Sequence, residues 1–156
     1  MAVRIDTATP GDIDDIVASA AALVADDAAR YDPATTNIDW AAVHGSAYAS
    51  ALLAGEHNLV LLARDGDGAI GHLVGRLHRG NSLHPVAVAE LESIYVYPDH
   101  RGRGVGNRLV DAFADWAAAR GAGRLSVTAY AANEGALRFY ARHGFAPRSV
   151  ILDREV

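Results

Sequence analysis

Residues 101 to 107 combine arginines and glycines in an order that can bind a phosphate. The run follows a strand-like stretch, leads directly into a helix-like one, and reads Arg101-Gly-Arg-Gly-Val-Gly-Asn107. The first N–H groups of a helix lack an intrahelical partner, and the helix dipole places partial positive charge at that end. Glycines let an anion approach this backbone closely. We therefore predict a pyrophosphate site formed by Arg101, Gly102, Arg103, Gly104, Val105, Gly106 and Asn107.

Two glutamates upstream of this turn, Glu90 and Glu92, can act as proton acceptors. They lie in the strand-like stretch 86–96, whose period of two predicts that Glu90, Glu92, Ile94 and Val96 share one face. An alkylammonium group with a pKa of about 10.4 is mostly protonated at neutral pH and cannot attack a carbonyl until a base removes its proton. The other interpretation is that one carboxylate only neutralises a cationic substrate or pairs with an arginine.

Two familiar phosphate motifs do not fit the glycine-rich turn. A P-loop requires Gly-Lys-Ser/Thr, whereas here Gly106 is followed by Asn107 and Arg108. A dinucleotide fingerprint requires a third glycine where this chain has Asn107, and it normally follows the first strand of a parallel sheet. A nucleotide-hydrolysing or dinucleotide-dependent enzyme is therefore disfavoured.

Composition excludes several further classes of function. The net charge of −5 argues against a nucleic-acid-binding protein and favours a cationic partner. The chain has no cysteine, which excludes disulfides and covalent cysteine catalysis. Its seven histidines show no H-x-x-x-H spacing, so we expect no metal site. No apolar run approaches the roughly 18 residues that cross a bilayer, so we expect no membrane contact and a cytoplasmic location.

Apolar periodicity predicts an α/β fold in one domain that spans residues 1–156. Strands are expected near residues 3–5, 59–63, 70–77, 86–96, 125–130 and 150–152, with a tight turn at Asp65-Gly-Asp-Gly68. Helices are expected from residue 10 to before Arg30, then near 38–54, 105–120 and 134–142, with Asn37 and Asn133 as N-caps.

The arginine–glycine turn fits the pattern Arg/Gln-x-x-Gly-x-Gly/Ala and resembles the acetyl-CoA-binding signature of the GNAT superfamily of N-acetyltransferases. The strand Ile94-Tyr-Val-Tyr-Pro98 and the amphipathic helix after the turn resemble the central motif of that family. A second signature lies downstream, where Asn133 precedes Tyr140 by seven residues and Gly144-Phe145 follows. Together with the order of elements, the resemblance covers nearly the whole chain and is weakest over residues 1–60.

The resemblance implies a fold and a reaction. The fold would be a mixed, mostly antiparallel sheet of six or seven strands, flanked by about four helices, with two neighbouring strands splayed apart around the cofactor. The reaction would be transfer of acetyl from acetyl-CoA to a primary amine of a small-molecule or peptidyl acceptor, by direct attack in a ternary complex. Relatives are often dimers, so a homodimer is a further expectation.

The resemblance also assigns roles to individual residues. The pantetheine arm would contact the backbone of Ile94, Tyr95 and Val96 and the residue Asn133, while the turn would hold the pyrophosphate. Tyr140 would be the general acid, because a phenol with a pKa of about 10 stays protonated and can donate to a departing thiolate. The plainer interpretation of Tyr140 is a ring packed on the core. The acceptor pocket would lie near Tyr31, Asp32, Trp40 and Tyr48, although ordinary packing explains Trp40 and Tyr48 equally well.

A non-catalytic acyl-CoA-binding or sensor module is the alternative function, because such a fold can keep its cofactor cleft without useful chemistry. The presence of Tyr140 and of the Glu90 and Glu92 pair argues against that alternative.

Overall fold

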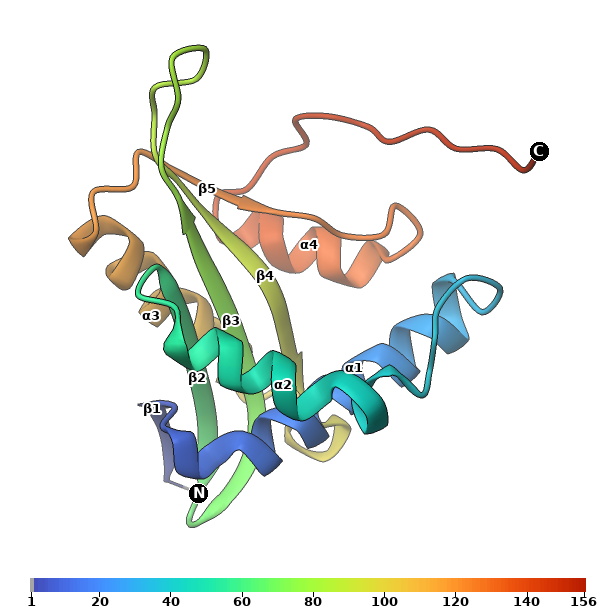
Figure 1. The fold of residues 1–156 in the computed structure, drawn as a ribbon, viewed down its shortest axis with the longest axis vertical. Coiled ribbons are helices and arrows are strands. Elements are labelled where there is room, and N and C mark those ends of the chain that lie inside the picture. Colours follow the sequence, from blue (N-terminus) through green and yellow to red (C-terminus); the bar gives the residue numbers. More distant parts are fainter. Residues whose placement is uncertain (1) are drawn as a thin grey trace.

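A mixed five-stranded sheet with the spatial order β1-β2-β3-β4-β5 forms the centre of the fold (Figure 1). The computed structural model describes residues 2–156. The strands are β1 (Val3–Thr7), β2 (Asn58–Asp65), β3 (Gly68–His78), β4 (Val88–Val96) and β5 (Arg124–Val127). The helices are α1 (Ile13–Tyr31), α2 (Trp40–Ala54), α3 (Val105–Ala119) and α4 (Glu134–Arg142), with short 3-10 turns η1 (Pro10–Asp12) and η2 (Pro98–His100). Neighbouring strands are antiparallel except β4 and β5, which run parallel.

Helices cover both faces of the sheet. The core on the side of α1 and α2 includes Ile16, Leu52, Val60, Leu62 and Val74. The core on the side of α3 includes Leu61, Leu73, Leu91, Leu109 and Phe113. Successive residues of β2 and β3 thus alternate between two buried faces, which explains why these strands read as nearly continuous apolar runs.

Several expected elements are confirmed almost to the residue. The turn between β2 and β3 contains Gly66 with φ of 61°, the positive value that a tight hairpin favours. The apolar stripe predicted for residues 105–120 forms α3, whose Leu109 and Phe113 are fully buried. Asn133 caps α4, and its side chain accepts a hydrogen bond of 3.1 Å from the Ala136 N–H.

A β-bulge in β4 changes which residues face the two layers. Val74 of β3 pairs with Ser93, whereas the next residue, Gly75, pairs with Leu91. Glu92 therefore has no residue opposite it, and the alternation of β4 shifts by one position.

The expectation that Glu90, Glu92, Ile94 and Val96 share a face is wrong because of this bulge. Glu90 and Glu92 lie on the side of α1 and α2, where Glu92 contacts Tyr48 of α2. Ile94 and Val96 pack on the opposite side, against the core beneath α3. A period of two cannot continue through an inserted residue.

The expected last strand at residues 150–152 is also absent, so the sheet has five strands rather than six or seven. Residues 145–156 carry no helix or strand, and every residue from Ala146 onward is exposed. A strand forms only where its backbone N–H and C=O groups find a neighbouring strand, and this segment runs away from the sheet (Figure 1).

The second helix begins slightly later than expected. Asp39, not Asn37, precedes the first residue of α2. The Asn37 side chain instead accepts a hydrogen bond of 3.1 Å from the Asp39 N–H, which forms a local turn before the helix.

Gly75 sets how closely α3 packs on the sheet, and Gly75→Ala should destabilise the protein by about 1–3 kcal/mol. A Cβ at Gly75 would lie 2.9 Å from the buried Phe113 ring. Thermal unfolding should show a fall in Tm of several degrees. Gly68→Ala in the same strand is the control, since its Cβ would meet only the Asp65 carbonyl oxygen at 3.6 Å. Equal stability of the two variants would contradict this interpretation of the packing.

Candidate active site

The turn between β4 and α3 exposes a helix start that no side chain caps. Gly102 and Gly104 have φ of 75° and 78°, values that favour glycine, and a Cβ at either would find no atom within 4 Å. The first helical hydrogen bond of α3 runs from the Arg108 N–H to the Gly104 carbonyl, at 3.1 Å. The N–H groups of the three residues before Arg108 precede that bond and have no carbonyl within the helix. This open backbone is suited to an anion.

Two side chains predicted to bind the pyrophosphate also hold the turn in place. Arg101 donates from Nε to the Val96 carbonyl at 2.7 Å, lies over the Tyr95 ring and pairs with Asp26 at 3.7 Å. The Asn107 Oδ1 lies 3.0 Å from His143 Nε2 and links α3 to α4.

A close contact reinforces the link between α3 and α4. A Cβ at Gly106 would lie 3.3 Å from the Phe139 ring of α4, so this glycine permits the two helices to approach. The glycine-rich turn and α4 are therefore joined by both packing and a hydrogen bond.

The strands β4 and β5 pair over only part of their length. Pairing extends from Val88 with Arg124 to Leu91 with Val127, and within residues 2–156 no strand pairs with this edge of β4 beyond Leu91. Residues 92–96 thus present backbone groups along an open edge that ends at the glycine-rich turn. Ile94, Tyr95 and Val96, the residues predicted to contact the pantetheine arm, all lie on this stretch.

Tyr140 lies on α4 and packs against the same core cluster as Ile94 and Val96 of the open edge. Its ring makes edge contacts with Phe139 and Phe145, at 5.4 and 5.8 Å between ring centroids. Burial, and to a smaller extent the negative charge of Asp27, raises the pKa of Tyr140 to about 12. The phenol is therefore protonated at neutral pH and can donate a proton.

A comparison with models of protein families identifies the family of this chain. The model of the acetyltransferase (GNAT) family matches residues 15–145. The chain belongs to the GNAT family of acetyltransferases. The expected resemblance is thereby confirmed, and the match includes the glycine-rich turn, Asn133 and Tyr140.

Individual relatives of this GNAT protein agree with that assignment. It is 39% identical over 64 residues to an uncharacterized N-acetyltransferase of Methanocaldococcus jannaschii, covering 41% of this chain and 28% of that protein. It is 45% identical over 56 residues to streptothricin acetyltransferase of Streptomyces lavendulae, covering 36% of this chain and 30% of that protein. The matched segments thus span less than a third of the length of these two relatives.

Solved structures share the fold over the whole length of this GNAT chain. The BH1408 protein of Bacillus halodurans, solved as a tetramutant, superimposes with a TM-score of 0.84 at 20% identity and full coverage of both chains. An aminoglycoside N-acetyltransferase solved with CoA superimposes with a TM-score of 0.76 at 20% identity, covering 99% of this chain and 95% of that one.

Residues 2–156 contain neither a membrane-spanning helix nor a metal-binding group of side chains. No helix there is long and apolar enough to cross a membrane. No group of three or more histidine and acidic side chains in that range is arranged to hold a metal ion.

The two predicted base candidates, Glu90 and Glu92, have different surroundings. Both oxygens of Glu92 are engaged, one by the Tyr48 hydroxyl at 2.6 Å and the other by Arg76 Nε at 2.7 Å. Glu90 lies 3.6 Å from His78 Nε2, and its side chain is more exposed than that of Glu92, at 41% against 28%. Burial, followed by the hydrogen bond to Glu92, raises the pKa of the Tyr48 phenol, so Tyr48 keeps its proton at neutral pH and donates a hydrogen bond to the carboxylate. Glu92, the bulge residue, is therefore bonded to both α2 and β3.

Asp27, near the end of α1, and Tyr130 were missed by the sequence analysis, which named only the neighbouring Tyr31 and Asp32. Burial, and then the charge of Asp26, raises the pKa of Asp27. Asp27 also acts electrostatically on Tyr140 and on Tyr130, and the Tyr130 ring stacks on Tyr31 at 5.1 Å. Adjacent carboxylates close to the C-terminal end of a helix oppose its dipole, and that signal was available in the sequence.

His72 was also missed, and it connects the bulge to α1. The ring is 1% exposed, with Nδ1 2.5 Å from the Ser19 hydroxyl and Nε2 3.0 Å from the Ser93 hydroxyl. Burial lowers the pKa of His72 to about 4, so the ring is neutral at physiological pH. A neutral ring has one donor and one acceptor nitrogen, which two hydroxyls can satisfy.

The stability of the protein should therefore decrease as the pH falls from about 6.5 to about 4. The unfolded chain protonates His72 near its ordinary pKa of 6.5, whereas the folded chain resists protonation until about pH 4. This difference corresponds to a loss of about 3 kcal/mol across the window. Denaturant unfolding at several pH values should show a smaller loss in His72→Gln than in the wild type.

Other groups also titrate in this range, so the difference between wild type and variant is the decisive quantity. His84→Gln, in an exposed loop, is the control and should keep the pH dependence of the wild type. An identical pH dependence for His72→Gln and the wild type would overturn the assignment.

Proposed function

We propose that this GNAT acetyltransferase transfers the acetyl group of acetyl-CoA to a primary amine, by direct attack in a ternary complex. The observation that carries the proposal is the open edge of β4 at residues 92–96, which leads to the uncapped start of α3 and whose Ile94 and Val96 share a core cluster with Tyr140. A phosphate site, an extended backbone and a proton donor thus follow one another along one path. That order suits a pyrophosphate, a pantetheine arm and a thioester.

The parts of the chain have separate tasks in this proposal. The backbone from Gly102 to Asn107 holds the pyrophosphate, with Arg101 and Arg103 adding charge, and the backbone of residues 94–96 with Asn133 aligns the arm. The amine nitrogen bonds to the thioester carbonyl carbon, the carbon–sulfur bond breaks, and Tyr140 donates its proton to the departing thiolate.

Glu92 is the proton acceptor that we favour for the attacking amine. It lies two residues before Ile94, about 7 Å along the strand, whereas Glu90 lies about 13 Å away. Because Arg76 and Tyr48 occupy its oxygens, transfer to Glu92 would run through a water molecule or a transient loosening of one contact. Glu90 remains the second candidate.

The acceptor in this proposal is a cationic amine, either a small molecule or a peptidyl amine. Asp27 is partly buried and close enough for its charge to raise the pKa of Tyr140, and the stacked Tyr31 and Tyr130 rings present an aromatic surface. Carboxylates and aromatic faces both attract organic cations. Two relatives named for antibiotics, the streptothricin and aminoglycoside acetyltransferases, support this choice of acceptor class.

Tyr140→Phe should lower kcat by about 10²-fold or more while leaving the acetyl-CoA dissociation constant nearly unchanged, since the thiolate loses its proton donor. Release of CoA thiol across a panel of amines measures turnover, and the absence of cysteine from the chain removes background signal. Calorimetry measures acetyl-CoA binding. Tyr97→Phe, a tyrosine outside the proposed site, is the control and should stay within about threefold of the wild type.

The same measurements separate the enzyme from the sensor alternative. Binding of acetyl-CoA by the wild type without thiol release over a broad amine panel would favour the non-catalytic module. If Tyr140→Phe turned over a working acceptor as fast as the wild type, the protein would still be an enzyme, but Tyr140 would not be its general acid.

Glu92→Gln should reduce kcat/KM by about 10²-fold at neutral pH, and the loss should shrink as the pH approaches the pKa of the acceptor amine. At high pH the amine loses its proton to solvent and needs no base. The pH profile of kcat/KM measures this recovery. If Glu92→Gln acted only by breaking the contacts with Tyr48 and Arg76, the loss of kcat/KM would be the same at every pH. A pH-dependent recovery seen in Glu90→Gln alone would assign the base role to Glu90.

A further inference from the structure

Ser19 of α1 and His72 of β3 are polar side chains buried between α1 and the sheet, at 0% and 1% exposure. The His72 ring connects α1 to β4, because its Nδ1 lies 2.5 Å from the Ser19 hydroxyl and its Nε2 lies 3.0 Å from the Ser93 hydroxyl. A buried polar group without a partner is costly in free energy. Both ring nitrogens therefore favour a backbone arrangement that keeps these two hydroxyls within reach.

Ser93 is the residue that directly follows the bulge in β4. It pairs with Val74, whereas His72 pairs with Tyr95, so the contact between ring and hydroxyl runs diagonally across the two strands. The inserted residue Glu92 and Ser93 reach the same side of the sheet, since Glu92 contacts α2 and Ser93 contacts a ring that is bonded to α1. Two consecutive side chains on one side are the result of an inserted residue.

The apolar residues of β4 do not by themselves determine where the extra residue lies. Leu91 before the bulge packs in the core beneath α3, and Ile94 after it packs against that core. If Ser93 rather than Glu92 were the unpaired residue, Glu92 would take the place opposite Val74. Leu91 and Ile94 would keep their partners in β3 and their faces. Burial of apolar side chains thus permits two positions of the bulge that differ by one residue.

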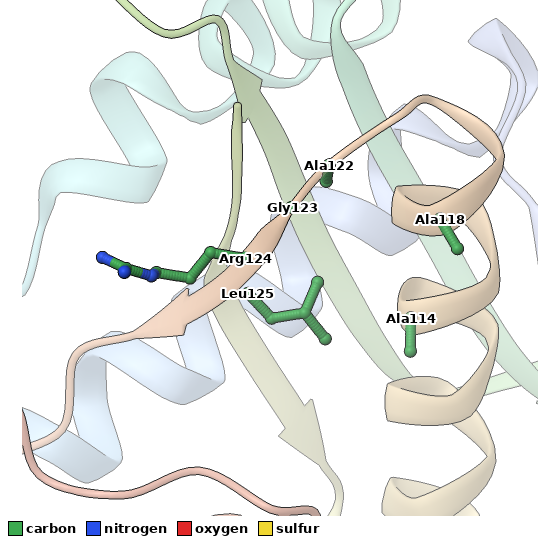
Figure 2. A pocket seen from close by; sticks show the side chains of 6 residues that line it. All are labelled: Ala114, Ala118, Ala122, Gly123, Arg124 and Leu125. Atoms are coloured by element: carbon green, nitrogen blue, oxygen red, sulfur yellow. The ribbon is translucent and has the colours of Figure 1, made fainter. Parts of the chain in front are cut away.

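The neighbouring strand β5 does not hold the bulge in place either. Its pairing with β4 ends at Leu91 and Val127, one residue before the bulge. Figure 2 shows how β5 is seated there, with Leu125 pointing towards the alanines of α3 and Arg124 pointing away from them. β5 therefore fixes the register of β4 only up to Leu91, and beyond it the register depends on contacts with β3 and α1.

The hydrogen bond to His72 distinguishes the two positions of the bulge. It forms when Ser93 lies opposite Val74. In the other position Glu92 would take that place, and its carboxylate would have to leave its partners on α2 and β3. The position of the bulge also decides which backbone N–H and C=O groups of residues 92–94 point to the open edge, because their direction alternates along a strand and the inserted residue interrupts the alternation.

We propose that His72 is a positioning residue for the acetyl-CoA site, and that it acts by holding Ser93 opposite Val74. The buried ring touches neither the cofactor nor the acceptor. It keeps the bulge at Glu92 and so determines the backbone groups that the open edge presents to an extended ligand. This inference rests on the proposed function, in which the pantetheine arm is the ligand of that edge.

Ser93→Thr and Ser93→Val test the bond, because the two new side chains have nearly the same shape and only threonine keeps the hydroxyl. Ser93→Thr should bind acetyl-CoA within about threefold of the wild type, and Ser93→Val should bind it about tenfold more weakly. Calorimetry measures both dissociation constants. In the free protein, the amides of residues 91–97 that bond to β3 should exchange hydrogen about tenfold faster in Ser93→Val than in Ser93→Thr.

Two controls separate positioning from a general loss of stability. Val60→Ala changes a buried residue of β2, so it should lower Tm but leave the acetyl-CoA dissociation constant within about threefold of the wild type. In a His72→Leu background, Ser93→Thr and Ser93→Val should bind acetyl-CoA equally well, because the ring that meets the hydroxyl is absent.

The proposal is overturned if Ser93→Thr and Ser93→Val agree in both affinity and hydrogen exchange, or if their difference persists in the His72→Leu background. It is also overturned if Val60→Ala weakens binding as much as Ser93→Val does. A wild type that binds no acetyl-CoA would contradict the proposed function instead, and hydrogen exchange in the free protein would then decide alone whether His72 holds the bulge.

Discussion

The separation of β4 from β5 after Leu91 is the constraint on which the rest of the site depends. A parallel pair that continued would consume the backbone N–H and C=O groups of residues 92–96, and nothing extended could bind there. The bulge at Glu92 lies at the point where that pairing stops, and a bulge bends a strand and increases its twist. The inserted residue thus coincides with the start of the open edge.

Most of the polar side chains around this edge are hydrogen-bonded to other groups of the protein and stabilise the fold. Ser19 and Ser93 fix His72, Tyr48 and Arg76 fix Glu92, and Arg101 ties the turn to the end of β4. With the side chains so engaged, the groups left to meet a ligand are largely backbone groups and the Tyr140 phenol. In the function that we propose, such a site would recognise a cofactor by its shape and length and would leave selection of the acceptor to residues of α1 and α2.

Sequence patterns predicted the parts of the fold whose signals are local. The hairpin at Gly66, the stripe of α3 and the Asn133 cap each depend on residues within one or two turns of the chain, and all three were found. The bulge could not be predicted, because the extra residue in β4 is defined only by its register with Gly75 of β3. Whether residues 150–152 form a strand likewise depends on the presence of a neighbouring strand, which a local sequence pattern cannot predict.

The candidate site divides in the same way. Its glycine-rich turn and Tyr140 lie within recognisable motifs, so their positions followed from the resemblance. Asp27 and His72 act through contacts with distant segments, and His72 has no distinctive neighbourhood in the sequence, whereas Asp27 is marked only by its acidic neighbour Asp26. Burial is a property of the assembled layers, and it is burial that perturbs the pKa of both groups.

The close approach of α3 and α4 has a consequence for how the protein can change over evolutionary time. Gly106 against Phe139, and Asn107 against His143, join the anion-binding turn to the helix that carries Tyr140. These contacts couple the two helices, so a substitution that shifts one of them should displace both ends of the proposed cofactor path. The α1 and α2 layer is packed separately, on the opposite face of the sheet. If that layer holds the acceptor, as we propose, substitutions there can change acceptor selection without displacing the two helices that we propose to hold the acyl donor.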